Sequence, residues 1–304
     1  MSLRELKPTT VKSYRQVISR CFKDWLDKPI RQISRKDVLQ RYSDIKDGIS
    51  ERAIQPEKAN PRGLAEAQKA MRYLSAIMNS YAGDKLNGEP LLPDGNPVEV
   101  LRDKRARKTL KPRNRFLEKK ERRALFDHLS IVHHREYKGA LKPAQADYIL
   151  MLMITGLRQG EARTLKWSDI DSDTYTVLDT KNNQPHTLPK TEVISSLFER
   201  NANDTEWLFP GRNGAASMDK VIEKASKETG IQFTAHVLRR TAATIAAEHG
   251  FTQDQIGRLL NHTSTSVTDR YIQRTTKALL PIVQLIENEI LANYETPGIK
   301  ANDK

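Results

Sequence analysis

Apolar residues recur every three or four positions along most of the chain, the spacing that gathers them on one face of an α-helix. Near the N-terminus, such a face is formed by Val11, Tyr14, Ile18, Phe22 and Trp25. Ser34 and Asp37 have the spacing of a capping box, which predicts a second helix there, and a third is expected over about 64–82. Residues 1–101 are therefore predicted to form a small all-helical domain.

The same periodicity continues through the rest of the chain with one interruption. Helices are predicted over about 117–130, 144–155, 217–229, 236–249, 252–260 and 278–292. Residues 175–189 instead have two strand-like ends around a polar centre, which favours a β-hairpin with Lys181 near its tip. The predicted fold class is thus mainly α with a small β-sheet (α+β), the sheet lying in a C-terminal domain of residues 116–304.

Two segments have the composition of connections. Residues 83–97 contain three prolines and three glycines, which indicates a loop. Residues 102–115 read RDKRARKTLKPRNR, with eight basic side chains in fourteen, and are expected to be an exposed interdomain linker. Such a run is often disordered, but between two DNA-binding domains it could lie along a phosphate backbone. Its candidate DNA contacts are Arg105, Arg107, Lys108, Arg113 and Arg115.

The net charge of +13 is concentrated in the first third of the chain. Residues 1–115 hold 26 Lys and Arg against 14 Asp and Glu, whereas the two kinds nearly balance in the remainder. A polyanion such as double-stranded DNA would explain the excess through phosphate contacts and counterion release. A basic surface kept for solubility would explain it equally well, and charge alone does not separate the two. The candidate DNA contacts in the first domain are Lys12, Arg15, Arg20, Lys69 and Arg72.

Composition also argues against several other classes of protein. The longest apolar run, ILMLMI at 149–154, is far too short to span a bilayer, and the chain does not open with a secretion signal. Cys21 is the single cysteine, which excludes an internal disulfide and a metal site built on thiolates. No cluster of carboxylates has metal-ligand spacing. We expect a cytoplasmic protein that uses no cofactor.

Three short clusters in the second half carry groups suited to phosphoryl transfer. They are TGLRQGE at 155–161, HVLRRT at 236–241, and LLNH at 259–262 followed by Tyr271. Arginines can hold phosphate oxygens, histidines can move protons, and a tyrosine can attack phosphorus if nearby cations favour its phenolate. Each cluster alone also has an ordinary explanation, such as a helix-end ion pair, a core histidine beside a surface arginine, or a helix C-cap.

Taken in order, the clusters resemble the motifs of the tyrosine recombinase (phage integrase) family. TGLRQGE resembles its first arginine box, HVLRRT its H-x-x-R box, and LLNHTSTSVTDRYI its closing histidine-then-tyrosine stretch. The N-terminal helices are similar to the family's core-site-binding domain, so the resemblance covers about residues 8–290. It implies an all-α core-binding domain, a linker at 102–115, and a C-terminal catalytic domain.

The resemblance implies roles for the side chains that would hold the phosphate. Arg158 and Arg239 would clamp the scissile phosphate, and Glu161 would brace them from behind. His262 would donate a hydrogen bond to a phosphate oxygen in the transition state.

It also implies which groups attack and which move protons. Tyr271 would form the 3′-phosphotyrosine link, His236 would take or share its proton, and Lys181 would protonate the 5′ leaving oxygen. Because the covalent link conserves the energy of the phosphodiester bond, rejoining would need neither ATP nor a metal.

The chain departs from the family pattern in two places. Asn261 stands where the family commonly has glycine, and because asparagine tolerates left-handed backbone angles, we expect the turn to persist. The sequence also begins at the core-binding helices, and the small arm-site domain of many phage integrases is missing from it, either by nature or by truncation, which leaves arm-site bridging open.

These observations together predict a site-specific DNA recombinase of a phage or mobile element, acting on the nucleoid of a bacterial host. It would work as a tetramer on two DNA sites, with DNA-bending or directionality factors as further partners. The apolar helix 278–292 is expected either to be exchanged between protomers, which we favour, or to fold back onto its own domain. A type IB topoisomerase-like enzyme and a catalytically silent DNA-binding regulator remain the alternatives.

Overall fold

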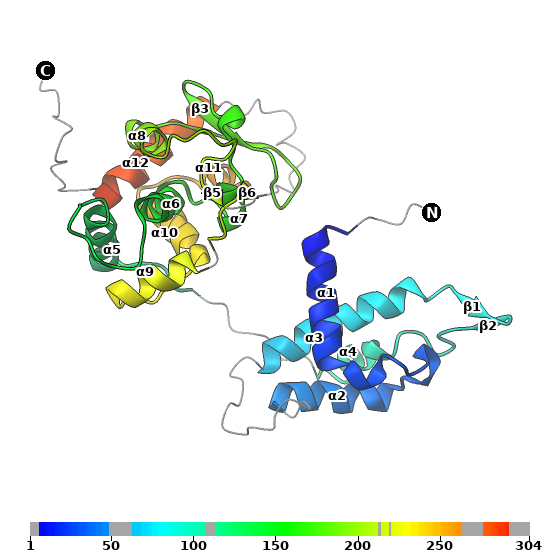
Figure 1. The fold of residues 1–304 in the computed structure, drawn as a ribbon. Coiled ribbons are helices and arrows are strands. Elements are labelled where there is room, and N and C mark those ends of the chain that lie inside the picture. Colours follow the sequence, from blue (N-terminus) through cyan, green and yellow to red (C-terminus); the bar gives the residue numbers. More distant parts are fainter. Residues whose placement is uncertain are drawn as a thin grey trace, which may run out of the picture. The chain divides into compact units, whose positions relative to one another are not determined.

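The computed structural model describes residues 6–48, 63–106, 114–211, 214–218, 220–262 and 276–291. The chain divides into two compact units, residues 1–113 and 114–304, which are drawn in Figure 1. Each unit has its own hydrophobic core. Among the described residues, no helix is both long and apolar enough to cross a membrane.

The N-terminal unit is built around one long helix. Its described elements are α1 (Pro8–Cys21), α2 (Arg35–Asp47), α3 (Gly63–Ser80), β1 (Lys85–Leu86), β2 (Glu89–Pro90) and α4 (Val100–Asp103). Helix α3 packs against both α1 and α2 and buries Ala67, Met71 and Leu74 between them. The predicted helical character of this region is confirmed.

The start of α2 agrees with the sequence prediction, whereas the end of α1 does not. Ser34 Oγ accepts a hydrogen bond from Asp37 N at 3.1 Å, and Asp37 Oδ2 accepts one from Ser34 N at 2.9 Å, so the predicted capping box starts α2. Helix α1 is shorter than its apolar stripe, because it ends at Cys21 and Trp25 lies in a separate 3₁₀ turn. Trp25 still packs against the core, which is why the stripe continues past the helix.

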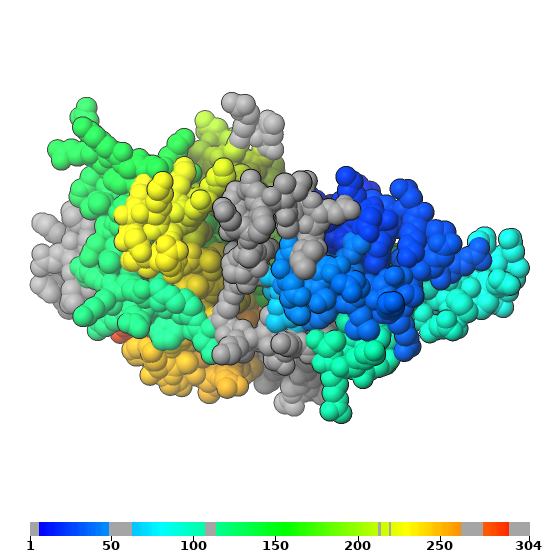
Figure 2. All heavy atoms as spheres, turned by 90° about the horizontal axis from the view of Figure 1, so that it is seen from below, coloured from blue at the N-terminus to red at the C-terminus, as the bar shows by residue number. Residues whose placement is uncertain are grey.

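The segments predicted as loop and linker contain short regular elements. Strands β1 and β2 form an exposed hairpin that projects from the body of the N-terminal unit (Figures 1 and 2). Helix α4 buries Leu101 and extends to Asp103, so the first residues of the expected linker belong to a helix. Residues 107–113 lie outside the described residues, and the candidates Arg107, Lys108 and Arg113 lie there with them.

The C-terminal unit is mainly helical among its described residues. Its helices are α5 (Lys119–Ile131), α6 (Pro143–Thr155), α7 (Gln159–Arg163), α8 (Glu192–Arg200), α9 (Val221–Thr229), α10 (Ala235–Glu248), α11 (Gln253–Leu259) and α12 (Leu280–Leu291). Its antiparallel strand pairs are β3 (Thr174–Val177) with β4 (His186–Pro189), and β5 (Pro210–Gly211) with β6 (Gly214–Ala215). The predicted fold class, mainly α with a small β-sheet, is confirmed.

Helix α6 forms the centre of this unit (Figure 1). All of its residues from Ala146 to Thr155 are buried, because α5, α8, α10 and α12 pack around it. A helix covered on every side needs no polar face, which explains the apolar run noted in the sequence. The site described below is assembled where α6 ends.

Helix α12 packs on its own unit, against α5, α6 and α10. It buries Ile282, Val283, Ile286 and Ile290, and also the carboxyl side chain of Glu287. Within a single chain the helix thus folds back onto its own domain, the alternative to exchange, and exchange between protomers stays a prediction.

Candidate active site

Arg158 is the N-cap residue of α7, three residues after the end of α6. Its Nη1 donates to Glu161 Oε1 at 2.8 Å, and its backbone N–H donates to Glu161 Oε2 at 3.0 Å. The Glu161 side chain is only 3% exposed, whereas that of Arg158 is 28% exposed. The buried carboxylate thus holds the arginine from the protein side and leaves part of its guanidinium open to solvent.

Gly156 allows the end of α6 to approach α10 and α11 closely. Its backbone is left-handed, with φ of 64°, and a Cβ added there would lie 2.7 Å from Leu260 Cδ2 and 3.4 Å from Ala242 Cβ. Glycine is the residue that adopts this backbone without strain and without the clash. The first arginine cluster therefore lies directly beside the two clusters that follow it in sequence.

Helix α10 buries its arginine and exposes its histidine. The apolar residues predicted to face the core are buried, namely Leu238, Ala242 and Ile245. Arg239 is only 6% exposed, and its Nη1 donates to Gly156 O at 2.6 Å while its Nη2 donates to Leu260 O. His236 is exposed, so the arrangement is the reverse of a core histidine beside a surface arginine. A guanidinium carries five N–H groups, so Arg239 keeps donors for a further acceptor.

Helix α11 ends in a Schellman motif that carries His262. Asn261 takes the left-handed position with φ of 47°, and its N–H donates to Arg258 O at 3.1 Å. The N–H of His262 donates to Gly257 O at 2.8 Å, which completes the motif. The expectation that asparagine supports this turn is confirmed.

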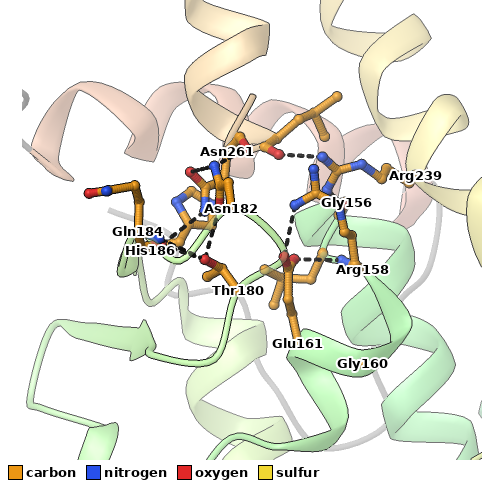
Figure 3. A network of polar contacts seen from close by, with 12 residues as sticks. Gly156, Arg158, Gly160, Glu161, Thr180, Asn182, Gln184, His186, Arg239 and Asn261 are labelled. Atoms are coloured by element: carbon orange, nitrogen blue, oxygen red, sulfur yellow. Dashed lines mark hydrogen bonds and ion pairs between the residues drawn. The ribbon is translucent and has the colours of Figure 1, made fainter. Parts of the chain in front are cut away.

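The carbonyl groups of residues 259, 260 and 261 each accept a hydrogen bond from a side chain of a different element (Figure 3). Carbonyls at a helix C-terminus have no partner within the helix, so these side chains satisfy groups that would otherwise need water. The donor and acceptor pairs are His186 Nε2 with Leu259 O at 2.9 Å, Arg239 Nη2 with Leu260 O, and Asn182 Nδ2 with Asn261 O at 3.1 Å. The turn is thereby tied to β4, to α10 and to the β3–β4 loop.

Lys181 lies in the loop between β3 and β4, residues 178–185. Strand β4 has the bounds expected from HTLP, whereas β3 ends at Val177, two residues before the end of the expected strand YTVLD, so the loop is longer. The Lys181 side chain is exposed, and it makes no hydrogen bond or ion pair with any residue that the structure describes.

Positive charge accumulates where these elements meet. Burial, and then the nearby charge of Arg158, lower the pKa of Arg239 to about 10, against the opposing effect of Glu161. The guanidinium remains charged at neutral pH. Among the described residues whose charge acts on Arg239, Glu161 is the one carboxylate, and Arg158 and Arg239 share it as their counter-charge.

Both histidines of the clusters feel the same charges. Partial burial lowers the pKa of His262, and the charges of Arg239 and Arg158 lower it further. Partial burial also lowers the pKa of His236, which is then lowered by the charges of Arg240, Arg239, Arg158 and Lys181. Arg158 and Arg239 thus lie within electrostatic reach of both histidines, and Lys181 lies within reach of His236.

Tyr271, the expected nucleophile, lies outside the described residues. Sequence reasoning also missed His186 and Asn182, which hold the turn of α11. His186 falls on the buried side of β4 together with Leu188, and a polar residue at a buried strand position was the available signal. No three His, Cys, Asp or Glu side chains gather as metal ligands within the described ranges.

The basic candidates in the N-terminal unit lie on two neighbouring helices. The rings of Tyr14 in α1 and Tyr73 in α3 stack with centroids 4.0 Å apart, which holds these helices side by side. Four of the five candidates are exposed, namely Lys12, Arg15, Arg20 and Arg72. Arg20 forms an ion pair with Glu66, and the ammonium group of Lys69 lies 5.5 Å from the centre of the Tyr73 ring.

The two described candidates of the expected linker differ in their surroundings. Arg105 is exposed. Arg115 instead donates to both carboxylate oxygens of Glu121, at 2.8 and 2.5 Å, and to Gln232 O at 3.3 Å. Arg115 is therefore engaged within the C-terminal unit, and its charge is already paired.

Comparison with known proteins identifies a matching family and several relatives. Residues 115–278 match the model of the phage integrase family. Over 158 residues the chain is 30% identical to tyrosine recombinase XerA of Pyrococcus furiosus, a match that spans 47% of this chain and 55% of that protein. It is 25% identical over 276 residues to tyrosine recombinase XerS of Streptococcus equi subspecies zooepidemicus, spanning 80% of this chain and 73% of the relative.

The fold is also similar to a solved structure of a lambda integrase tetramer bound to a Holliday junction. The similarity has a TM-score of 0.60 with 19% sequence identity, and it covers 87% of this chain and 74% of the other. At that identity the likeness concerns the fold alone.

Proposed function

The chain belongs to the phage integrase family of tyrosine recombinases, and we propose that it recombines specific double-stranded DNA sites through a phosphotyrosine intermediate. As a member of this family it is a DNA breaking-rejoining enzyme. The proposal assigns Tyr271 as nucleophile and places the activity on the nucleoid of a bacterial host, in the movement of a phage or other mobile element.

The observation that carries the proposal is the excess of cations at the end of α6. Arg158 and Arg239 share Glu161, while His236 and Lys181 lie within electrostatic reach. Burial and a second arginine lower the pKa of Arg239, and one carboxylate cannot balance two guanidinium charges, so a phosphodiester would supply the missing negative charge. Extra negative charge builds up on phosphorus in the transition state, so these cations would stabilise it more than the ground state.

The reaction then follows from which bonds form and break. The Tyr271 hydroxyl oxygen attacks phosphorus while its proton passes to His236, and the bond from phosphorus to the 5′ oxygen breaks. Lys181 gives its proton to that leaving oxygen. Rejoining runs the same steps backward from a 5′ hydroxyl, so one phosphodiester is exchanged for another without ATP or metal.

DNA binding would be divided between the two units. The exposed cations of α1 and α3 are suited to the phosphate backbone, with Arg105 and the residues that follow it as further contacts. We extend the proposal to a tetramer on two DNA sites, the assembly named for the lambda integrase structure, with DNA-bending or directionality factors as additional partners.

Covalent capture tests the assignment and identifies the DNA site in the same experiment. Wild type and Tyr271→Phe are expressed in cells, the cells are lysed in denaturant, and DNA that stays attached to the protein is sequenced. We expect attachment in the wild type only, concentrated at a few paired sites. Attachment by Tyr271→Phe would refute the nucleophile. Attachment scattered over the genome would favour a topoisomerase-like activity, and none in either variant would favour a silent regulator.

A further inference from the structure

The loop that carries Lys181 is joined to the turn that carries His262 by side chains. Among the described residues, no backbone hydrogen bond links residues 178–185 to residues 257–262. The link is instead reciprocal between two asparagines that face each other in Figure 3. Asn182 Nδ2 lies 3.1 Å from Asn261 O and 3.2 Å from Asn261 Oδ1. Asn261 Nδ2 lies 3.3 Å from Asn182 Oδ1 and 3.4 Å from Gln184 O.

The loop side of this link is itself held in shape. Thr180 is buried, and its hydroxyl lies 2.9 Å from Asn182 Oδ1 and 2.7 Å from Gln184 O. The same hydroxyl accepts a hydrogen bond from Gln184 N at 3.1 Å. Asn182 is therefore presented to Asn261 by a folded loop rather than by a free strand of chain.

This arrangement matters because no contact among the described residues fixes the position of the Lys181 side chain. Its side chain is exposed and bonded to no described residue, and a lysine side chain has several rotatable bonds. The position of its backbone is what the fold can fix before DNA arrives. Lys181 is one residue from Asn182, and His262 is one residue from Asn261.

We propose that Asn182 and Asn261 form a positioning clamp that fixes the Lys181 loop against the His262 turn, so that the two reacting groups keep one relative placement. The inference rests on the proposed function, because it takes Lys181 as the proton donor to the leaving oxygen. Neither asparagine is assigned a contact with DNA, and both act through their neighbours.

Asparagine at position 261 could also serve only the left-handed backbone, and one substitution separates these roles. Asn261→Gly keeps a residue suited to φ of 47° and removes the side-chain bonds. The matched control is Asn183→Gly. Asn183 lies in the same loop at φ of 57°, and its side chain has no hydrogen bond to another described residue.

Backbone amide exchange tests the clamp in the full-length protein without DNA. In Asn182→Ala, amides of residues 257–262 should exchange about fivefold faster, although the change is far away in sequence. In Asn261→Gly, exchange should also rise in residues 180–184, but by less, because the bond from Asn182 Nδ2 to Asn261 O remains. Asn183→Gly should leave residues 257–262 unchanged. Unchanged exchange across the link in both clamp variants, or an equal increase in the control, would overturn the clamp.

Cleavage of a substrate with sulfur at the 5′ bridging position tests whether the clamp positions Lys181. A thiolate leaves without a proton donor, so this DNA bypasses the general acid. With ordinary DNA of the site mapped by covalent capture, Asn182→Ala should cleave at least about tenfold more slowly than wild type. With the sulfur substrate it should cleave at the wild-type rate.

Lys181→Ala keeps this outcome distinct from a failure of the proposed function. If sulfur does not restore Lys181→Ala, the proton-donor role assigned to Lys181 is wrong. If sulfur restores Lys181→Ala but not Asn182→Ala, the asparagine supports the fold in some other way and the positioning role is refuted. Restoration of both variants supports it.

Discussion

Glu287 should make the C-terminal unit less stable at alkaline than at acidic pH. It lies on α12, 7% exposed, and accepts a hydrogen bond from Thr191, the N-cap residue of α8. Burial, opposed by the hydrogen bond from Thr191 and aided by the charge of Glu192, raises the pKa of Glu287 from 4.5 to about 7. The folded state therefore holds the proton more tightly than the unfolded state.

The sign and size of the effect follow from this difference. Stability is unaffected below pH 4.5, falls as the pH rises from 4.5 to about 7, and stays reduced above that. A difference of that size corresponds to at most about 3 kcal/mol. Glu287→Gln resembles the protonated acid and can still accept from Thr191. It should stabilise the unit by up to about 3 kcal/mol at pH 8 and by less than about 1 kcal/mol at pH 5.

Urea unfolding followed by tryptophan fluorescence measures this difference. A Trp25→Phe background confines the signal to Trp167 and Trp207, which both belong to the C-terminal unit. Glu199→Gln is the control, because that side chain is exposed on the same helix α8 and does not act on the pKa of Glu287, so its effect should be the same at pH 5 and pH 8. An equal effect of Glu287→Gln at both pH values would refute the reasoning.

Three further predictions concern the candidate active site. Glu161→Gln should slow cleavage of the mapped site by about tenfold to a hundredfold, because Arg158 loses its buried counter-charge, and unaltered single-turnover rates would contradict this. Gly156→Ala should lower the free energy of unfolding by about 1–3 kcal/mol, and Leu260→Ala in the same chain should recover only the part due to the clash. His236 should stay neutral and active as a base below its usual range, because its pKa is lowered. Cleavage at subsaturating DNA should therefore decline only below pH 6.5, and half-loss at or above that pH would exclude His236 as this base.

Much of the fold follows from patterns that are local in sequence. The capping box at Ser34 and the left-handed turn at Asn261 depend on residues close together in the chain, and both occur as predicted. Helix α8 was missed because only Ile194, Leu197 and Phe198 are buried in its nine residues, too few to establish a period. For α12, periodicity predicted the helix but not the surface against which it packs, because an apolar face does not specify what covers it.

The site was harder to predict because its geometry depends on contacts between distant segments. The order of the motifs identified Arg158 and Arg239 as candidates. It did not indicate that, on α10, Arg239 is buried and His236 is exposed. The hydrogen bonds from His186 and Asn182 join residues more than 70 positions apart. A hydrogen bond of that kind leaves no periodic signal, since it needs only one suitable side chain at each end.

The carbonyl groups of the α11 turn explain how a cationic site can be assembled before DNA binds. Arg239 is buried beside Arg158 with Glu161 as their shared carboxylate, an arrangement that desolvation and like-charge repulsion oppose. Hydrogen bonds from Arg239 to Gly156 O and Leu260 O set the negative ends of two carbonyl dipoles against its charge. These dipoles offset part of the repulsion without neutralising the guanidinium. The attraction for a phosphate therefore remains, and the same bonds that stabilise the buried guanidinium also fix the turn on which His262 lies.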